Sequence, residues 1–341
     1  MSGSSLDGID VVFASFAEND QNSSFEIDRS FAIKYTPEMR ANLAKARSFT
    51  PEALLELEHV FGQWLADALS KQGLKDYDPS FIATHGHTIF HNPSKHYSCQ
   101  LSGAHQLCAR LNVPVIFDFR MSDIARGGQG APLVPAGEVA LFKEYDAFIN
   151  LGGIANITFT APEVRAWDIV PFNQVLNALS DKLGLAYDPE GKNARKGKMD
   201  HLWYEKWSSH SFFASDPPKS ISNEWVQKYF LEKLPGPFDG LHTYCHFAAD
   251  QIATTINTQP CMNSKRIVML SGGGAYNSYF VELLKEKSSS PVIIPSQEII
   301  EYKEALIFAF LGLLRWKGKT NVLKTVTGAT QDTTAGTIIL P

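Results

Sequence analysis

Three glycine-rich turns adjoin segments that have the composition of strands, and they are the part of the sequence best suited to chemistry. They lie at residues 3–8, 152–153 and 272–274. Glycine lets a backbone approach a ligand closely, and the N–H groups of such turns suit a phosphate. One such turn would be an ordinary tight turn, whereas three on separate strands favour a nucleotide cleft. The sequence has neither a P-loop pattern nor a GxGxxG after its first strand, which disfavours P-loop kinases and Rossmann dehydrogenases.

Asp168 is the carboxylate best placed for acid–base chemistry. It follows a short apolar stretch and precedes Pro171 and Asn173. An aspartate at the end of a strand and facing a cleft can serve as a general base. The same residue could instead cap the following helix or bind a turn. Asp7 could orient Mg²⁺ or a phosphate, or it could only stabilise its own turn.

The histidines of the His85-Gly86-His87 segment could suggest a metal site. Residues at positions i and i+2 of a strand point to opposite faces, so the two rings are poorly placed to share one ion. Hydrogen bonding to a polar ligand, or a structural role, is the favoured interpretation. No protein metal site is predicted.

Two further charged positions are candidates for ligand contacts. Arg120 and Asp123 come just beyond a buried apolar strand, where α/β sheets meet their ligands, although they could also form an ion pair with each other. Glu304 lies on the apolar helix 301–316, where an acid needs a partner or a ligand.

The elements that must position these residues alternate between strands and helices. A strand pair at 9–16 and 24–35 precedes an amphipathic helix at 54–69, and strands at 147–151, 154–160 and 165–170 precede a helix at 173–184. The pattern predicts two α/β units, each starting with a glycine turn beside an antiparallel strand pair. We expect domains at 1–140 and 141–325, and a tail at 326–341 that returns towards the first domain.

The composition excludes several classes of protein. Of 341 residues, 44% are hydrophobic and 20% charged, which is typical of a globular protein rather than a disordered one. A net charge of −5 argues against nucleic-acid binding, and no apolar run is long enough to span a bilayer. The four cysteines form no CxxC pair, and the first residues lack the features of a signal peptide, so a cytoplasmic location is expected.

Eight stretches together point to one known family. In chain order they are MSGSSLDGID at 1–10, HGHT at 85–88, DFR at 118–120, GGQGAPLVP at 127–135, NLGGIAN at 150–156, PPKS at 217–220, SGGGAYN at 271–277 and VTGA at 326–329. With these motifs the chain resembles the anhydro-N-acetylmuramic acid kinases, which belong to the sugar kinase/Hsp70/actin superfamily. The resemblance extends over nearly the whole chain.

The resemblance implies two actin-like (ribonuclease H-like) lobes with mixed β-sheets flanked by helices and ATP in a cleft between them. It implies an enzyme that uses ATP and Mg²⁺ to open 1,6-anhydro-N-acetylmuramic acid with water and to phosphorylate O6, in cell-wall recycling. The segment that would bind ATP comprises Gly3, Ser4, Ser5, Leu6, Asp7, Gly8, Ile9 and Asp10. Gly152 and Gly153 would form a second phosphate loop, with Gly272, Gly273 and Gly274 on the adenosine side. Asp168 would be the general base, and the sugar would meet His85, Arg120, Asn173 and Glu304.

Two features depart from the family pattern. Residues 168–173 read DIVPFN where the family has DTGPGN, so we expect Val170 and Phe172 to crowd a loop that should approach sugar or phosphate. The family also has an apolar strand before its Met-Ser-Gly turn, so we expect an open sheet edge here, which could promote a homodimer. A kinase for a different (anhydro)sugar and a non-catalytic ATP- or sugar-binding homologue are the alternative functions.

Overall fold

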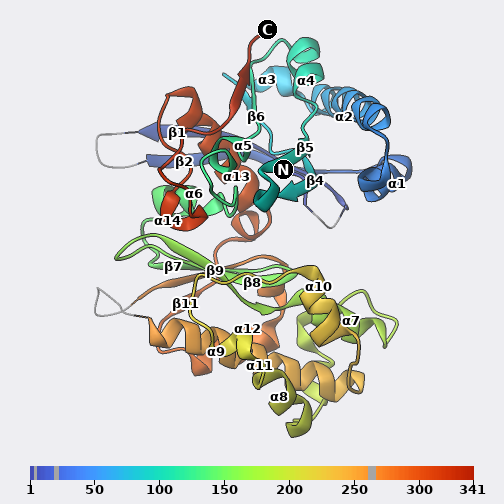
Figure 1. Ribbon diagram of the computed structural model, residues 1–341, viewed down its shortest axis with the longest axis vertical. Helices are drawn as coiled ribbons and strands as arrows, with labels where there is room; N and C mark the ends of the chain where they lie inside the picture. Colours follow the sequence, from blue (N-terminus) through green and yellow to red (C-terminus); the bar gives the residue numbers. More distant parts are fainter. Residues whose placement is uncertain (4–5, 19–22, 260–265) are drawn as a thin grey trace. The chain divides into compact units, whose positions relative to one another are not determined.

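The computed structural model describes residues 1–3, 6–18, 23–259 and 266–341, and it divides into two compact units. Unit 1 comprises Met1–Lys143 together with Tyr302–Pro341, and unit 2 comprises Glu144–Glu301 (Figure 1). Both combine strands with helices, so the predicted α/β fold class is confirmed. In the part of the chain that is described, no helix is long and apolar enough to cross a membrane.

The described residues of unit 1 form three separate sheets. The hairpin β1(Gly8–Glu18)–β2(Ser23–Lys34) is antiparallel, β6(Val115–Phe117) lies between β3(Ile82–Ala83) and β12(Thr337–Ile339), and β4(His87–Asn92) pairs with β5(Tyr97–Leu101). Its helices are α1(Pro37–Lys45), α2(Pro51–Lys71), α3(Leu74–Tyr77), α4(Ala104–Leu111), α5(Met121–Ile124), α6(Val134–Leu141) and α14(Lys324–Thr327), with short 3₁₀ turns at Ala46–Ser48 and Pro93–Lys95.

Two helices of unit 1 begin where the sequence indicates. Thr36 precedes Pro37 at the start of α1, and Thr50 precedes Pro51 at the start of α2. The Thr36 hydroxyl accepts the N–H of Met39 at 3.1 Å, which satisfies a donor that the first turn leaves unpaired. Thr50 caps α2 in the same way. Proline after each cap suits a position whose N–H would have no helical partner.

Unit 2 is built on one continuous mixed sheet of order β11-β10-β7-β8-β9. The strands are β7(Ala147–Leu151), β8(Ile154–Phe159), β9(Arg165–Pro171), β10(Val268–Ser271) and β11(Val292–Ile293), and β7 runs antiparallel to β8 but parallel to β10. The helices are α7(Asn173–Asp181), α8(His201–Ser208), α9(Ser211–Ala214), α10(Asn223–Val226), α11(Pro237–Thr258) and α12(Ser278–Lys287), with a π-helical turn Gln227–Leu231 and 3₁₀ turns at Pro189–Gly191, Ala194–Lys196 and Gly273–Tyr276.

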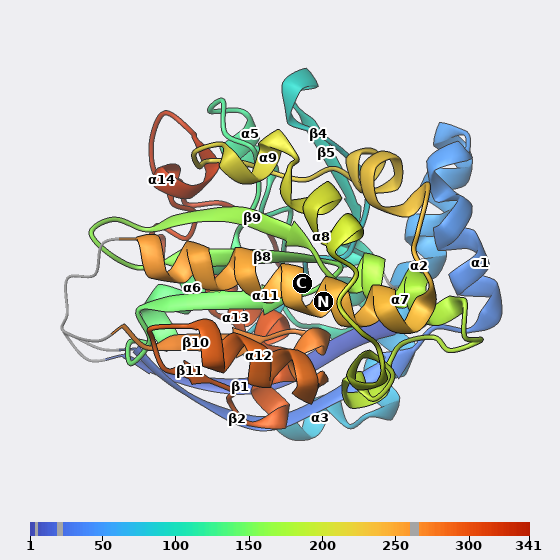
Figure 2. The same cartoon turned by 90° about the horizontal axis from the view of Figure 1, so that it is seen from below.

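The core of unit 2 lies on one face of this sheet. Alternate residues of β7 and β8, such as Ile149, Leu151 and Ile157, join one apolar cluster with α7, α11 and α12. Figure 2 shows α11 lying along the sheet. Because successive strand residues point to opposite faces, the residues between them belong to the other face, where the polar side chains of the strands gather.

The boundaries of the units differ from the predicted domains at one point. Residues 302–325 were expected in the second domain, but they belong to unit 1. The reason is that α13(Gln297–Trp316) is a single unbroken helix, so the sequence contains no turn signal near residue 301. From Lys303 onwards this helix packs on unit 1, where the Lys303 ammonium meets the Glu138 carboxylate at 2.5 Å and Phe310 contacts Phe16. The tail is also part of unit 1, through β12.

Candidate functional site

A row of polar side chains crosses the sheet of unit 2. Ser271 of β10 lies beside Asn150 of β7, Asn150 lies opposite Asn156 of β8, and Asn156 lies opposite Asp168 of β9. Directly paired residues of neighbouring strands share a face, so the four side chains form one row. Asn150, Asn156 and Asp168 are each partly exposed, although their neighbours along every strand are buried. The sheet therefore presents amide and carboxylate groups at one place on an otherwise apolar framework.

Asp168 is held in this row by the segment Lys219–Ile221, which lies far along the chain. Its backbone N–H donates to the Lys219 carbonyl at 3.0 Å, and its Oδ2 accepts the Ile221 N–H at 2.8 Å. The Lys219 ammonium in turn donates to the carbonyls of Phe212 and Ser215. The predicted alternative, that Asp168 caps the following helix, is wrong, because the cap position of α7 is Phe172 and has no side-chain hydrogen bond.

The environment of Asp168 makes its carboxylate a better base than an ordinary aspartate. Burial raises its pKa, and the hydrogen bond from the Ile221 N–H opposes that change only in part. A raised pKa means that the carboxylate holds a proton more tightly once it has accepted one. A partly exposed carboxylate with this property can take a proton from a water molecule.

The turn at Gly152 and Gly153 is fixed to the start of α7. The Gly152 carbonyl accepts the Asn173 N–H at 3.1 Å, and the Gly153 carbonyl accepts the Phe172 N–H at 2.8 Å. The Asn173 side chain also donates to the Leu151 carbonyl at 2.9 Å. Asn173 therefore holds the end of β7, and the first helical turn uses its backbone donors to shape the glycine turn.

The turn at Gly272–Gly274 lies directly beside the first one. Gly272 has φ +83°, and a Cβ there would overlap the Asn150 Oδ1 atom, so glycine is required on both counts. A Cβ at Gly274 would overlap the Phe172 ring. Gly273, by contrast, is exposed, and the nearest atom to a Cβ built there is the Asn173 amide nitrogen at 4.0 Å. This turn thus offers an accessible backbone to a ligand.

Val170 and Phe172 do not crowd the loop. Both are fully buried, and Phe172 packs edge-on against Phe280 with ring centroids 4.6 Å apart. The expectation that these side chains obstruct the approach of a ligand is therefore wrong. A β-bulge at Ile169 lets Asp168 face the polar side while Val170 pairs with Ala155 on the core side.

Unit 1 contains a second cluster, built around Arg120. Its guanidinium donates to His85 Nε2 at 2.7 and 3.0 Å and to the Gly130 carbonyl at 2.6 Å. His85 Nδ1 lies 3.0 Å from the Gly86 carbonyl, so Nδ1 carries the proton and Nε2 accepts. Burial and the adjacent Arg120 charge lower the pKa of His85 well below its usual value, which keeps the ring neutral. Glu304 attracts the Arg120 guanidinium, whose pKa burial lowers to about 10.

Asp123 does not pair with Arg120 as the sequence allowed. It is fully buried, and its carboxylate accepts the Gly130 N–H at 2.8 Å and the Thr327 hydroxyl at 2.7 Å. Arg120 and Asp123 thus hold the same glycine from its two sides. This explains why the stretches at 127–135 and 326–329 occur together, because Asp123 ties them into one loop cluster.

The first turn of the chain is less fully described, since Ser4 and Ser5 lie outside the described residues. Leu6 has φ +55°, Asp7 is exposed, and a Cβ at Gly8 would overlap the Ile33 carbonyl. His87 bonds to the Ser2 hydroxyl at 3.1 Å, so it supports this turn. Gly3 and Asp10 are partly exposed and Ile9 is buried.

Each unit, taken by itself, exposes one group of a kind that can contact a nucleotide or its cation. Gly273 offers open backbone, and the Asp7 carboxylate is on the surface. Among the described residues, no three His, Cys, Asp or Glu side chains could hold a metal by themselves. Mg²⁺ in nucleotide sites needs only one or two carboxylates, because phosphates and water complete its shell. A single exposed aspartate beside a glycine turn is compatible with that chemistry.

The structure groups the predicted residues by unit. Unit 2 brings Asp168, Asn173 and two glycine turns together near the carboxyl ends of β7 and β10. Unit 1 brings His85 and Arg120 together, with Glu304 within electrostatic range of Arg120. Sequence reasoning missed Asn150 and Asn156. Their signal was available, because a hairpin folded at Gly152-Gly153 places these two asparagines opposite each other.

The comparisons of sequence agree on one family. The pattern that defines the anhydro-N-acetylmuramic acid kinases matches residues 1–341. The anhydro-N-acetylmuramic acid kinase of Azorhizobium caulinodans is 32% identical over 368 residues, covering 100% of this chain and 98% of the relative. That of Nitrobacter winogradskyi is 31% identical, covering 100% and 98%.

Solved structures resemble the chain more distantly. The activator of the 2-hydroxyisocaproyl-CoA dehydratase from Clostridium difficile with bound ADPNP has a TM-score of 0.41 and 14% identity, covering 92% of this chain and 99% of the activator. The full-length match to the family pattern and the identity of the relatives over their whole length together establish that this chain belongs to the anhydro-N-acetylmuramic acid kinase family.

Proposed function

We propose that this protein is an ATP-dependent kinase that opens 1,6-anhydro-N-acetylmuramic acid with water and phosphorylates O6. The product would be N-acetylmuramic acid 6-phosphate. Membership of the family supports the substrate and the reaction. The single observation in the structure that carries the proposal is Asp168, a partly exposed carboxylate of raised pKa, held by the Ile221 N–H and flanked by Asn156.

The proposed reaction couples two changes at the sugar. Asp168 takes a proton from a water molecule, whose oxygen forms a bond to C1 while the bond from C1 to O6 breaks. The freed O6 attacks the γ-phosphoryl group of ATP, and ADP leaves. The water supplies the new C1 hydroxyl and ATP supplies the phosphoryl group. Asp168 releases the proton that it accepted to the solvent after the reaction, which returns the carboxylate to its ionised form and balances atoms and charges. General-base help of this kind contributes roughly 10²- to 10⁴-fold to a rate.

The residues of unit 1 would bind the sugar. Arg120 keeps its charge at neutral pH, since its pKa of about 10 is still well above 7. Its orientation is set by neutral His85 and by the Gly130 carbonyl. A fixed guanidinium suits the lactyl carboxylate of a muramic acid, because its planar donors match a carboxylate. Glu304 is our candidate for accepting hydrogen bonds from sugar hydroxyl groups.

The glycine turns would bind ATP. We assign the phosphates to residues 3–10 and to Gly152-Gly153, and the adenosine side to 272–274, where Gly273 leaves the backbone open. Asp7 would hold Mg²⁺ together with the phosphates of ATP. The ion, when bound, would neutralise part of the phosphate charge. In this proposal the residues of the chain place hydrogen-bond donors around the phosphates and orient the sugar. Positioning and electrostatic stabilisation of this kind provide much of the rate in phosphoryl transfer.

We also propose a cytoplasmic location and a homodimer. ATP and an anhydro amino sugar released from the cell wall would meet in the bacterial cytoplasm. A homodimer would form through an unpaired sheet edge, because such an edge can pair with a strand of a second copy. Size-exclusion chromatography with light scattering would test the dimer, and a monomer at working concentration would remove it.

A coupled ADP-release assay with a panel of anhydro and reducing amino sugars tests the function. We expect release that depends on 1,6-anhydro-N-acetylmuramic acid and exceeds the rate with N-acetylmuramic acid and anhydro-N-acetylglucosamine. Release with another sugar only would replace the substrate. Binding of ATP seen by thermal shift, with no turnover of any sugar, would contradict the proposed enzyme.

A further inference from the structure

The connection between α9 and α10 holds the proposed base, Asp168, by two backbone bonds. This 215–222 segment runs beside β9 (Figure 2). The Lys219 carbonyl accepts the Asp168 N–H at 3.0 Å, and the Ile221 N–H donates to Asp168 Oδ2 at 2.8 Å. The carboxylate can be placed no more exactly than these two groups are. The contacts that hold the segment itself therefore bear on the chemistry of Asp168.

The side chain of Lys219 ties the 215–222 segment to the end of α9. Its ammonium donates to the carbonyls of Phe212 and Ser215, at 3.0 Å in both cases. The last carbonyls of a helix lack partners within the helix, so a cation is favourable there. Lys219 thus joins two places, because its ammonium holds the start of the segment while its carbonyl meets Asp168.

The rest of the segment has little freedom once both ends are held. The Lys219 ammonium lies 4.8 Å from the centre of the Phe212 ring, and this ring packs against the core of unit 2. Pro217 and Pro218 fix two φ angles between the bonded residues. Ile221 is buried, and its side chain joins the same core. A change at Lys219 is therefore transmitted along a short, stiff stretch of chain.

Lys219 acts on Asp168 through this backbone rather than through its charge. Burial raises the pKa of Asp168, and the hydrogen bond from the Ile221 N–H lowers it. Burial lowers the pKa of Lys219, and the nearby Asp216 carboxylate raises it. The hydrogen bond, which depends on where Ile221 lies, is thus the link between the two side chains.

We propose that Lys219 is a positioning residue for the base. By bonding to the carbonyls of Phe212 and Ser215, it keeps the Ile221 N–H directed at Asp168 Oδ2. Fixing one carboxylate oxygen also fixes the direction of the other, and proton transfer from a water molecule depends on that direction. The effect on catalysis rests on the proposed function, in which Asp168 is the base, whereas the effect on the placement of Asp168 does not.

Carbon-13 NMR of the carboxyl groups tests this proposal without relying on activity. Lys219→Met removes the donors but keeps an apolar chain of similar length, whereas Lys219→Arg keeps donors for both carbonyls. In Lys219→Met we expect the Asp168 signal to titrate at a pH about 0.5 to 1 higher, because the ionised form loses the Ile221 N–H. We also expect amide exchange at Ile221 to quicken by about tenfold. Lys219→Arg should keep both values close to those of the unaltered chain.

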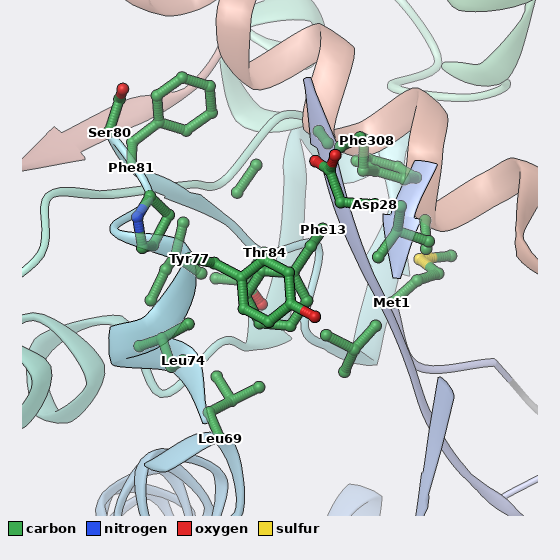
Figure 3. Close-up of a pocket in the computed structure, with 18 of the residues that line it drawn as sticks. Met1, Phe13, Asp28, Leu69, Leu74, Tyr77, Ser80, Phe81, Thr84 and Phe308 are labelled. Atoms are coloured by element: carbon green, nitrogen blue, oxygen red, sulfur yellow. The ribbon is translucent and has the colours of Figure 1, made fainter. Parts of the chain in front are cut away.

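Matched controls come from both units. Asp168→Asn assigns the signal by removing it. The exposed Lys206 of α8 places its ammonium 4.0 Å from the centre of the Trp203 ring, so Lys206→Met removes a cation–aromatic contact of the same kind and should change neither value. Asp28 borders the cavity of about 440 Å³ in unit 1 (Figure 3) and accepts the Ser15 hydroxyl at 3.0 Å. Its signal is an internal reference that should be the same in every variant.

Sugar-dependent ADP release then connects the placement of Asp168 to the proposed function. Lys219→Met should lower kcat by roughly 10- to 10²-fold and move the acid limb of the pH profile to higher pH. The KM for the sugar should hardly change, and Lys219→Arg should restore most of the rate. A shifted Asp168 signal without any change in kcat or pH profile would mean that Asp168 is not the base. That result contradicts the proposed function but leaves the positioning role intact.

The positioning role itself is overturned by a different result. In Lys219→Met, an Asp168 signal and an Ile221 exchange rate equal to those of the unaltered chain would exclude it, whatever the activity. A shift in Lys219→Arg as large as that in Lys219→Met would also exclude it, because arginine retains the donors. If Lys219→Met does not fold, Lys219→Gln, whose shorter side chain reaches less far towards the two carbonyls, replaces it under the same criteria.

Discussion

The two units differ in how far their strands join into one sheet. In unit 2 the sheet is continuous, and β7 connects the hairpin β8–β9 to β10. In unit 1 the hairpin β1–β2 and the strand β3 belong to separate sheets with a cavity of about 440 Å³ between them. The difference shows what a central strand contributes. It closes the core, and its carboxyl end supplies the glycine turn around which a polar site is built.

The polar groups of the two units also differ in how they are held. In unit 2, Asp168 lies on a strand and is bound by backbone groups only, so its position depends on the sheet. In unit 1, Arg120 follows a short strand and is bound by a side chain and a loop carbonyl. We therefore expect chemistry that demands exact geometry in unit 2, and recognition of the substrate in unit 1. Four predictions test that division.

Loss of the base in unit 2 should have the largest effect. The Asp168→Asn variant should lower kcat by roughly 10²- to 10⁴-fold while leaving ATP binding unchanged, because only proton removal is lost. Steady-state kinetics and nucleotide titration measure the two quantities. Asp181→Asn, at an exposed position of the same unit, is the matched control and should keep full activity. Full turnover by Asp168→Asn would remove the assignment.

The stability of Asp168→Asn is informative in itself. A raised pKa in the folded protein means that ionisation at neutral pH is less favourable there than in the unfolded chain. Replacement by a neutral amide should therefore not lower the thermal midpoint at pH 7, and a marked loss would indicate a structural role.

The loss of stability caused by removing a buried ring should also differ between the two units. Phe172→Ala in unit 2 removes a fully buried ring from a continuous core and should cost about 3–5 kcal/mol. Phe13→Ala in unit 1 removes a ring that already borders the cavity and stacks on Tyr77, with centroids 4.2 Å apart. Its cost should be smaller, since fewer contacts surround it. Chemical denaturation followed separately in each unit would measure both, and equal costs would contradict the comparison.

The recognition role of unit 1 gives the third prediction. Arg120→Lys keeps the charge but loses the planar donors that bind His85 and Gly130, so kcat/KM for the sugar should fall on the order of 10²-fold through a higher KM. The exposed Arg110→Lys is the control. A change in the KM for ATP alone would place Arg120 with the nucleotide rather than the sugar.

The smallest predicted effect is a shift in pH dependence. Because burial raises the pKa of Asp168, activity should be lost as pH falls through a value above that of an ordinary aspartate. The Ile221 N–H favours the ionised form, so Ile221→Pro, which removes that donor, should move the acid limb of the pH profile to higher pH. Ile221→Val keeps the donor and should not shift it. An identical profile for both variants would exclude Asp168 as the titrating group.

Much of the fold could be predicted from local sequence signals. Threonine-proline pairs indicate where α1 and α2 begin, and stretches of strand-forming residues located the strands on both sides of Gly152-Gly153. The end of unit 2 could not be predicted, because α13 passes residue 301 without a break and only tertiary contacts such as that of Lys303 with Glu138 assign its second part to unit 1. The strand β12 was missed, since its pairing with β6 depends on residues more than 200 positions away.

The candidate site was predicted by residue type but not by geometry. The motifs identified Asp168 and the glycines, yet the Lys219–Ile221 segment that holds Asp168 lies too far along the chain for any spacing rule. The crowding expected from Val170 and Phe172 was wrong, because a β-bulge at Ile169 determines which side chains face the core, and the sequence does not show a bulge.

Isotope labelling tests the central claim most directly. The reaction is run in water enriched in oxygen-18 with 1,6-anhydro-N-acetylmuramic acid and ATP, and the product is analysed by mass spectrometry with fragmentation. If Asp168 activates a water molecule that attacks C1, one labelled oxygen appears at C1 of the sugar 6-phosphate and none in its phosphate group. Label found only in free phosphate, with no labelled sugar product, would mean that the protein hydrolyses ATP without opening the anhydro ring.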